Sequence, residues 1–476
     1  MNCLVSIILL FLLSVIAFCF SVQCTQYGVS YTTISTRHNN RSYSIHSISI
    51  ETGSHQQMTT RNQTRQSNRF LFFIPDYHDG TRYDLASSLT YMNQSVVLSN
   101  TKGGIKKWFP LRINQTKEYD ASSPFPQIVV PKEILWGPDE AIRVWNESIL
   151  ERSYSTILNY KPFQQSDCVV CMYLPSYCQY YVGFNKTTIF IPAHRFFLKK
   201  CYREEYDNLY RVMFTDFPNV HVLASGLYDY EHIYYFSGKR VPILYSSSLF
   251  GYDQPHSYHP IRDDYLVGPF KKEEIPFEKE LMSACDRSSM KECNFTTMLK
   301  AFGKGWEFES LFQFKAAIIF PYATLSYFMN DLFASCIPIF VPSPSFLEEL
   351  KLMIMRFGRS FCPHGGGRYY TQITTNYTNH PFNPEDESKE ARIYWNHFST
   401  FYSPSVTVFN SWDDLFVKLQ NTNLEQKFKL RQKENDVIKK NNIVQWKRLF
   451  GLIEKNREMP PTYEDALQRF GVKSFL

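Results

Sequence analysis

The chain has 476 residues, of which 44% are hydrophobic and 17% aromatic, and a formal net charge of +6. This length and apolar content are enough for two domains with large cores. The charge is modest and dispersed, without the Lys/Arg run of a nucleic-acid-binding stripe, so no nucleic-acid partner is expected.

The chain begins with an apolar segment, residues 1–24, in which Leu4–Phe20 carries no charged side chain. This segment is slightly long for the core of a signal peptide and slightly short for a spanning helix. Small side chains before Cys24 favour cleavage there. An uncleaved single-pass anchor is the alternative, although such an anchor usually has Lys or Arg before the apolar run. Both predict entry into the secretory pathway, with residence in the ER or Golgi lumen or secretion, and membrane contact only through an uncleaved anchor.

Eight Asn-x-Ser/Thr sequons support this compartment, and each one that is used must lie on a solvated loop or element edge. They are Asn40, Asn62, Asn93, Asn114, Asn146, Asn185, Asn294 and Asn376. Eight of the 11 cysteines follow Cys24, and in an oxidising lumen they are expected to form disulfides, whose pairing the sequence leaves open. Cys168-Val-Val-Cys171 could be half a zinc site or a redox motif, but no second CxxC and no His pair follow it.

A polar stretch, Glu51–Ser67, predicts a flexible stem over residues 25–68. Residues 69–250 then alternate buried-strand runs with helical spacing, which is typical of βαβ units and a mainly parallel sheet. Strands are expected at residues 70–74, 95–98, 127–130, 167–171, 187–191, 220–224 and 241–245, and helices at 139–152, 204–214 and 229–236.

Residues 251–264, with two prolines and two histidines, predict a hinge. A second βαβ series follows over residues 265–423, with strands at 265–268, 316–320, 337–341 and 406–409 and helices at 298–302, 325–335, 346–357 and 411–419. Residues 424–476 form a tail with helical periodicity, and Asn441-Asn442 is expected to break it into two helices. The fold class is therefore α/β, with two Rossmann-like domains, a C-terminal helical tail, and a ligand crevice at the carboxyl ends of the strands.

The segment Ala316–Leu347 is the most informative for function. A strand ends at Phe320, and the next helix presents its N-terminus, a phosphate-binding feature, toward the crevice. Asp331 on that helix can accept hydrogen bonds from a ribose diol. The run Asp331–Ile339, DLFASCIPI, resembles the donor-site helix-turn-strand of GT-B glycosyltransferases and is similar to the exostosin-type GCIPV ending. Asp331 replaces the usual Glu and Cys336 the usual Gly.

The wider pattern from about residue 160 onward resembles a group of glycosyltransferase-like secreted proteins that largely lack an assigned activity. The resemblance implies a GT-B fold, with a UDP- or GDP-linked sugar bound by the second domain and an acceptor against the first. It implies donor contacts from Gly268, Lys271, Lys272, Tyr322, Ser326 and Asp331. A general base from the first domain would be His194, with Asp229 and Glu231 next. No metal or resident cofactor is required by this architecture.

Each assignment has a plainer interpretation. Asp331 could be a solvated helix residue, His194 could bond a loop together with Arg195, and Lys271-Lys272 could be surface charge. The sequence contains no GxSxG, HExxH or GxxxxGK[ST] motif. The favoured function is transfer of a sugar from a nucleotide-sugar donor to a glycan or glycoprotein acceptor in the secretory pathway. The alternative is a secreted carbohydrate-binding or interaction protein that kept the fold and lost the chemistry.

Overall fold

The computed structural model describes residues 29–38, 41–50, 69–75, 79–99, 127–128, 157, 161–172, 178, 181–182, 184, 186–192, 213–214, 219–248, 258–268, 277–290, 293–303, 308–321, 326–350, 377–384, 386 and 388–456. The chain divides into two compact units, residues 1–68 and residues 69–476. Within the described residues, no helix is both long and apolar enough to cross a membrane.

The first unit contains an antiparallel hairpin of β1 (Val29–His38) and β2 (Arg41–Ile50), in which Val29 pairs with Ile50 and His38 with Arg41. β-branched and aromatic side chains recur along both strands, which suits a pleated ladder. The prediction of a flexible stem over residues 25–68 therefore does not hold for these two strands. The polar stretch Glu51–Ser67, on which that prediction was based, lies outside the described residues.

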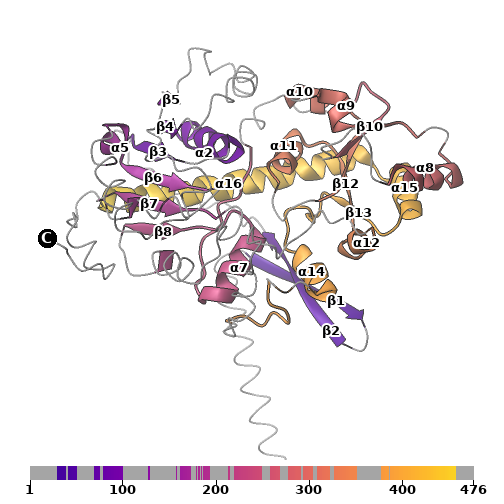
Figure 1. Cartoon of the computed structure of the whole chain (residues 1–476), viewed down its shortest axis with the longest axis horizontal. Coiled ribbons are helices and arrows are strands. Elements are labelled where there is room, and N and C mark those ends of the chain that lie inside the picture. The colour runs from indigo at the N-terminus through magenta and orange to yellow at the C-terminus, as the bar shows by residue number, and fades with distance from the viewer. Residues whose placement is uncertain are drawn as a thin grey trace, which may run out of the picture. The chain divides into compact units, whose positions relative to one another are not determined.

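The second unit holds the first domain, built on a six-stranded parallel sheet in the order β5-β4-β3-β6-β7-β8 (Figure 1). This is the Rossmann order 3-2-1-4-5-6, numbered along the chain. The strands are β3 (Leu71–Ile74), β4 (Ser95–Ser99), β5 (Gln127–Ile128), β6 (Cys168–Cys171), β7 (Thr187–Phe190) and β8 (Val220–Val222). The helices are α2 (Asp79–Tyr91), α5 (Lys161–Gln165) and α7 (Leu227–Ser237). The strand expected at 241–245 is reduced to a single parallel bridge, Ala224 with Ile243.

The second domain is built on a five-stranded parallel sheet in the order β10-β9-β11-β12-β13, the other common doubly wound order, 2-1-3-4-5. Its strands are β9 (Tyr265–Gly268), β10 (Phe295–Thr297), β11 (Ala316–Ile319), β12 (Ile339–Pro342) and β13 (Thr407–Phe409). Its helices are α8 (Glu278–Arg287), α9 (Met298–Phe302), α10 (Phe308–Leu311), α11 (Tyr327–Ser335), α12 (Pro344–Glu349), α14 (Lys389–Asn396) and α15 (Trp412–Asn421).

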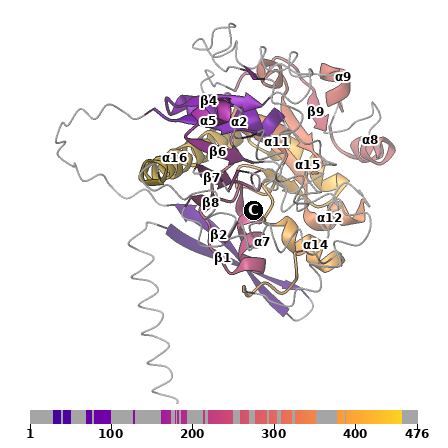
Figure 2. The ribbon, with the colours of Figure 1, turned by 60° about the vertical axis from the view of Figure 1, so that its left-hand side comes forward.

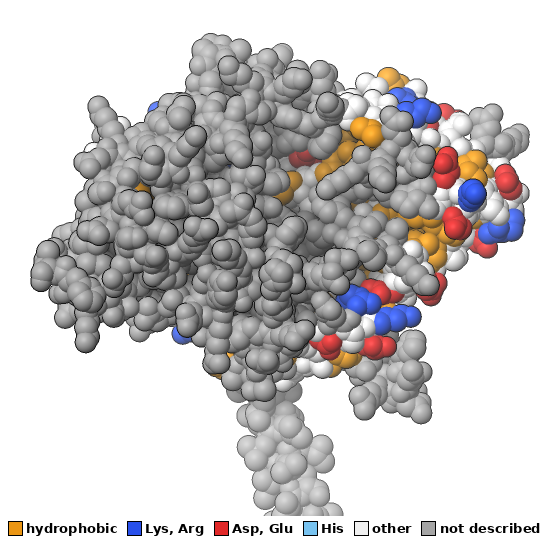
Figure 3. All heavy atoms as spheres, in the orientation of Figure 1, with side chains coloured by type: hydrophobic (Ala, Val, Ile, Leu, Met, Phe, Trp, Pro, Cys, Tyr) orange, Lys and Arg blue, Asp and Glu red, His pale blue; other side chains and the backbone are white. Residues whose placement is uncertain are grey.

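The strands of the second sheet are buried on both faces, which explains why they read as continuous apolar runs in the sequence. One face packs Leu266, Ala317 and Ile339 against α11, and the other packs Val267, Ile318 and Phe340 against α8 and α15. On the surface of this domain, acidic and basic side chains are intermingled, as in the pairs Arg287–Asp413 and Lys418–Asp414 (Figure 3).

A single helix, α16 (Leu424–Asn456), closes the described chain and runs beside both sheets (Figures 1 and 2). Phe428 contacts Tyr258 at the start of the second domain, with ring centroids 5.8 Å apart, while Trp446, Leu449 and Ile453 belong to the core of the first domain. The predicted two parallel-sheet domains and C-terminal helical tail are thus confirmed, and the structure adds that the tail returns to the first domain.

The predicted break at Asn441-Asn442 is wrong, because α16 is continuous there. Asn441 Nδ2 donates to the carbonyl of Ile243 at 3.0 Å. Asn442 Nδ2 donates to the carbonyl of Tyr245 at 2.7 Å, and its Oδ1 accepts from the Tyr245 N–H at 3.0 Å. Both side chains form tertiary hydrogen bonds, so they do not compete for the backbone hydrogen bonds of their own helix.

Candidate functional site

Each sheet has one topological switch point, where successive connections leave in opposite directions along the sheet. In the first sheet it lies between β3 and β6, and in the second it lies between β9 and β11. Open α/β sheets bind ligands in the crevice beyond the carboxyl ends of the strands at this point. Two loops, the one after β9 and the one after β11, therefore define the candidate ligand site of the second domain.

All the residues that the sequence assigns to donor binding except Asp331 belong to these two loops or their ends, and Asp331 lies on α11. Gly268 is the last residue of β9, and Ser326 is the N-cap of α11, the helix that follows β11. Ser326 is 2% exposed, and its side chain makes no capping hydrogen bond to α11. Lys271, Lys272 and Tyr322 belong to the same loops but lie outside the described residues.

Gly268 also has a reason to be glycine that involves no ligand. A Cβ at this position would come within 2.6 Å of both Cγ and Sδ of Met298, which begins α9. The carbonyl of Gly268 accepts a hydrogen bond from the Phe320 N–H at 2.8 Å, which fixes the end of β9 to the end of β11. The glycine therefore holds α9 close to the sheet at the edge of the candidate site.

Asp331 does not lie on a solvated face of α11. Its side chain is buried, with 2% exposure, and its carboxylate accepts a hydrogen bond from Ser248 Oγ at 2.8 Å. Ser248 belongs to the segment that follows the bridge at Ile243, and its backbone is left-handed, with φ at 47°. The geometry therefore gives Asp331 a structural role at the junction between the domains.

Asp84 on α2 completes this junction, and the sequence analysis did not identify it. Its carboxylate accepts hydrogen bonds from Ser246 Oγ at 2.5 Å, from the Ser247 N–H at 3.1 Å and from the Ser248 N–H at 2.9 Å. Asn330 on α11 donates to Ser246 Oγ at 2.7 Å. We call Asp84, residues 246–248, Asn330 and Asp331 the junction cluster. It joins α2, which follows β3, to α11, which follows β11. Each of these strands borders the switch point of its own sheet.

The protonation of Asp84 is affected by its burial. Desolvation raises the pKa of its carboxyl from 3.8 to about 6, and the negative charge of Asp331 adds to this rise. The hydrogen bonds from residues 246–248 act in the opposite direction, because they stabilise the carboxylate. The junction cluster thus contains a carboxyl group that titrates near neutral pH.

The three candidate bases of the first domain have different surroundings. His194 lies outside the described residues. Asp229 is 4% exposed and accepts a hydrogen bond from Ser225 Oγ, which makes it a buried anchor of the first turn of α7. Glu231, one half-turn further along α7, accepts a hydrogen bond from His380 Nε2 at 2.9 Å.

His380 joins Glu231 to Tyr394 in an acid–base cluster that links α7 to α14. His380 Nδ1 lies 2.5 Å from Tyr394 Oη, and its ring packs at a tilt against Trp395 and edge-on against Phe398, with centroids 4.7 and 5.3 Å away. With Nε2–H donating to the Glu231 carboxylate, Nδ1 accepts from the Tyr394 hydroxyl, whose pKa is raised by burial and by Glu231. A Cβ at Gly226, the N-cap of α7, would lie 3.6 Å from Thr400 Cγ2, so the start of α7 lies close to the chain that follows α14.

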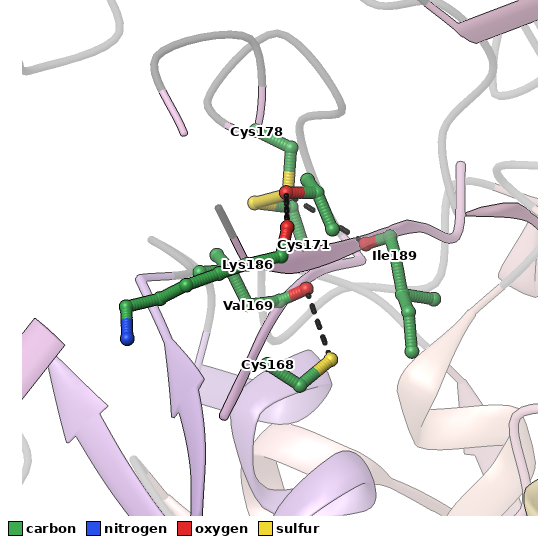
Figure 4. Close-up of a disulfide and its surroundings, with 7 residues drawn as sticks. Cys168, Val169, Cys171, Cys178, Lys186 and Ile189 are labelled. Carbon is green, nitrogen blue, oxygen red and sulfur yellow. Dashed lines mark hydrogen bonds between the residues drawn. A yellow bond between two sulfur atoms is a disulfide. The ribbon is translucent and has the colours of Figure 1, made fainter. Parts of the chain in front are cut away.

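The cysteines near the first switch point have structural roles. Cys171 ends β6 and forms a disulfide with Cys178, while Cys168 remains a buried thiol that donates toward the carbonyl of Val169 (Figure 4). Burial raises the pKa of the Cys168 thiol, which makes it a poor nucleophile. A second disulfide joins Cys285 and Cys293. Over the described ranges, no group of three or more His, Cys, Asp or Glu side chains is placed to hold a metal ion.

Cys336, which replaces the glycine of the resembling motif, occupies the left-handed C-cap of α11 with φ at 59°. Glycine is the residue preferred there. The thiol lies 3.2 Å from Asn435 Nδ2 on α16, so the cysteine keeps the backbone turn of the motif and adds a buried contact.

Three site residues escaped the sequence analysis: Asp84, His380 and Tyr394. Asp84 lies inside α2, and its partners are 162 to 164 residues away, so the local sequence gives no signal for it. His380 and Tyr394 had none, since they meet Glu231 only through the fold.

No family model matches the sequence, and no curated protein matches it significantly. Three glycosyltransferase structures align with most of the chain. UGT89C1 from Arabidopsis thaliana, in complex with UDP, is 12% identical over 82% of this chain and 100% of its own, with a TM-score of 0.42. SnogD from Streptomyces nogalater is 12% identical over 86% and 100%, with a TM-score of 0.33. The glycotransferase of kitacinnamycin is 9% identical over 81% and 98%, with a TM-score of 0.37. The three alignments thus span most of both chains, at sequence identities of 9 to 12% and TM-scores of 0.33 to 0.42.

Proposed function

We propose that the chain transfers a sugar from a nucleotide-linked donor to a glycan or glycoprotein in the secretory pathway. One observation carries the proposal. The loops after β9 and β11, which flank the switch point of the second sheet, contain the residues that the sequence resemblance assigns to the donor. Five of the six assigned residues, Gly268, Lys271, Lys272, Tyr322 and Ser326, belong to these loops by sequence, and the sixth, Asp331, lies on α11.

The donor diphosphate would bind at the N-terminus of α11, the helix that follows β11, because the helix dipole favours negative charge there. Lys271 and Lys272 would stabilise the negative charge that develops on the diphosphate as the sugar leaves. UDP and GDP sugars are the donors proposed, since both present a diphosphate and a ribose.

The Glu231–His380–Tyr394 cluster would supply the acid–base group. Glu231 fixes the imidazole with its proton on Nε2, which leaves Nδ1 as the basic nitrogen. An acceptor hydroxyl that replaced Tyr394 Oη at Nδ1 would give its proton to the imidazole, and its oxygen would attack the sugar carbon as the diphosphate leaves. The Glu231 carboxylate would stabilise the imidazolium that forms.

The proposed compartment is supported by the surface and by the cysteines. Asn93 and Asn294, the two sequon asparagines among the described residues, are both exposed. Two disulfides, Cys171–Cys178 and Cys285–Cys293, are typical of proteins that fold in an oxidising lumen.

A second candidate function is favoured by Asp331. Its carboxylate is buried and hydrogen-bonded to Ser248, so a donor ribose would have to find another acidic partner. A carbohydrate-binding protein that has lost transfer activity would need no such partner. The two functions differ in nucleotide binding, which a transferase requires.

The test is thermal melting of the purified full chain with UDP, GDP and their sugars. A nucleotide at about 100 times its dissociation constant adds roughly 2.7 kcal/mol to the free energy of unfolding, which raises the melting temperature by a few degrees. We expect the double variant Lys271→Ala/Lys272→Ala to lose the shift. Lys279→Ala, on the exposed face of α8, is the matched control and should keep it.

A shift that survives in the double variant would place the nucleotide elsewhere on the chain. The absence of any shift with all donors would overturn the transferase proposal and leave the binding protein as the better account.

A further inference from the structure

Two sequons in the described part of the chain are built into folded segments. One spans Asn93–Ser95, where α2 leads into β4, and the other spans Asn294–Thr296, which leads into β10. The asparagine of each sequon is exposed, whereas Gln94 and Thr296 are buried, with 7% and 9% exposure. Each sequon therefore presents its asparagine to solvent but not its full length.

The first sequon begins in the turn that ends α2. Asn93 has a left-handed backbone, with φ at 58°, and its N–H donates to the Thr90 carbonyl at 2.8 Å. The Gln94 N–H donates to the Leu89 carbonyl at 2.9 Å. These two hydrogen bonds make a Schellman motif, in which Asn is accepted at the left-handed position. The backbone of Asn93 is therefore held in a compact turn.

The rest of the first sequon is fixed by the chain that enters β3. Gln94 Oε1 accepts from the Phe70 N–H at 2.8 Å, and Gln94 Nε2 donates to the Met92 carbonyl at 2.9 Å. The Ser95 N–H donates to the Phe70 carbonyl at 3.0 Å, and Ser95 then begins β4. Both residues that follow Asn93 are thus engaged once β3 and β4 have paired.

The second sequon is fixed in a similar way by the second sheet. The Asn294 carbonyl accepts from the Tyr265 N–H at 2.9 Å, and Thr296 pairs with Leu266 in the ladder of β9 and β10. The Thr296 hydroxyl donates to the Asp264 carboxylate. The hydroxyl that defines this sequon is therefore both buried and hydrogen-bonded after the strands have paired.

Both sequons lie at the amino edges of their sheets. Ser95 pairs with Leu71 at the start of β4 and β3, and Phe295 pairs with Tyr265 at the start of β10 and β9. The candidate ligand crevice lies at the opposite edges, where the strands end. A glycan on either asparagine would therefore be attached at the edge opposite the crevice.

We propose that Asn93 and Asn294 carry N-glycans attached during synthesis, and that folding of each sheet then closes its sequon to the glycosylating enzyme. The proposal rests on the secretory compartment of the proposed function. In the reaction, the asparagine amide nitrogen attacks the anomeric carbon of a lipid-diphosphate-linked oligosaccharide. A C–N bond forms, the C–O bond to the diphosphate breaks, the lipid diphosphate leaves, and the amide nitrogen loses one proton to a base of the enzyme.

The closing step follows from what the enzyme must recognise. An acceptor site requires the asparagine together with the hydroxyl two residues later, so the enzyme has to bind the sequon along its length. In the folded chain, Gln94 and Thr296 are held by the hydrogen bonds described above. Folding and glycosylation therefore compete for the same residues.

The test is translation of the full chain in an extract with ER microsomes, in which a competing acceptor tripeptide sets the time of modification. In one arm the tripeptide is left out, and in the other it is present during synthesis and removed after folding. We expect late removal to lower the occupancy of Asn93 and Asn294 at least about tenfold, because a stable fold leaves only a small unfolded fraction. Mass spectrometry measures occupancy, since enzymatic release of the glycan converts asparagine to aspartate.

A Gly/Ser tail with one sequon, appended after Leu476, is the matched control and should be modified equally in both arms. Phe72→Asp and Ile318→Asp place a charge in the core of the first and second sheet, at positions with 0% exposure, and should prevent folding. Late modification of Asn93 and Asn294 should then reach the level of the tail. Asn93→Gly removes one acceptor and keeps the left-handed turn, so its loss of a single glycan assigns that site in a folded chain.

The outcomes separate this inference from the proposed function. Late modification of the folded chain at the level of the tail, or no recovery in the two core variants, would overturn the closing step. A modified tail with unmodified Asn93 and Asn294 would overturn both sites and leave the compartment intact. An unmodified tail would overturn the compartment together with this inference, while nucleotide-dependent melting would still test the transferase independently.

Discussion

At the scale of the residue, the junction cluster is the most informative feature of the molecule. Asp84 is buried in a position where its charged form is desolvated and only partly compensated by hydrogen bonds. Buried carboxylates of this kind are costly unless they are fully paired. The Asp84 carboxylate therefore links α2 to residues 246–248, and its negative charge also lowers the stability of the fold near neutral pH.

Asp84→Asn should change how stability depends on pH. The folded-state pKa of Asp84 is raised from 3.8 to about 6, so the folded protein binds an extra proton between these values and loses stability as pH rises through them. For the wild type, this pKa shift corresponds to a loss of about 3 kcal/mol in the free energy of unfolding. The Asn side chain does not titrate, so the variant does not lose this stability. Relative to the wild type, the variant should therefore gain about that much free energy of unfolding between pH 4 and pH 7.

The measurement is denaturant-induced unfolding of both proteins across this pH range. Asp263→Asn, which removes an exposed carboxylate paired with Lys315, is the control and should give a profile parallel to the wild type. Parallel profiles for the Asp84 variant as well would show that its carboxyl has an ordinary pKa.

The positions of single site residues could be predicted where they depend on local pattern. Gly268 and Ser326 follow buried strands, and their place at the carboxyl edge of the sheet was evident from the sequence. The contacts of Asp331 and Glu231 could not be predicted from the sequence, because their partners lie 83 and 149 residues away. Spacing along the chain contains no information about such pairs, so an acid expected to meet ribose is found against Ser248.

At the scale of the element, α16 shows how tertiary contacts override local preference. Asn is a weak helix former, and two in succession predict a break. In α16 both side chains satisfy backbone groups of residues 243–245, a stretch with one sheet bridge. The helix thus supplies residues 243–245 with hydrogen bonds that an adjacent strand would otherwise have made.

Asn442→Ala should destabilise the protein by about 1–3 kcal/mol, because the N–H and carbonyl of Tyr245 lose their partner in a part-buried position. Local helix propensity favours the opposite sign, since Ala is the better helix former. Thermal unfolding against Lys440→Ala, an exposed position on the same helix, separates the two effects. A variant as stable as the control would mean that water replaces the lost hydrogen bonds.

Most strands could be predicted, because buried parallel strands are short apolar runs bounded by turn residues. The helices α2, α8 and α14 were harder to predict from the sequence. In α14, for example, only Ala391, Trp395 and Asn396 are buried, so its apolar stripe is narrow and broken by charge. The hairpin β1–β2 was missed because composition outweighed its alternating pattern.

At the scale of the whole molecule, α16 ties the two domains together. Arg431 stacks on Phe333 with its guanidinium carbon 4.0 Å from the ring centroid, and Asn435 donates to the Phe333 carbonyl at 2.7 Å. Near the other end of the helix, Trp446 packs edge-on against Phe72 of β3, 6.0 Å between centroids. The overall class, two parallel-sheet domains, could be predicted from alternating patterns, whereas strand order could not, because it depends on long-range pairing.

Trp446→Ala should cost about 3–5 kcal/mol, the range for deleting a large buried aromatic side chain, since Trp446 is 1% exposed. Because α16 is shared, amide exchange should accelerate in both sheets and not in the first alone. Val444→Ala, at a position 61% exposed, is the control and should stay within about 0.5 kcal/mol of the wild type. Faster exchange confined to the first sheet would show that the helix does not couple the domains.

The placement of Trp446, Leu449 and Ile453 in the first core also bears on how the chain is made. Domains usually fold in order as the ribosome delivers them, the N-terminal one first. Here the first domain begins at residue 69, yet three side chains of its core are synthesised only after the whole second domain. While the second domain is being translated, the core around β3, β6 and β7 has α2 but lacks α16, so part of its apolar surface stays exposed on the nascent chain until α16 is made.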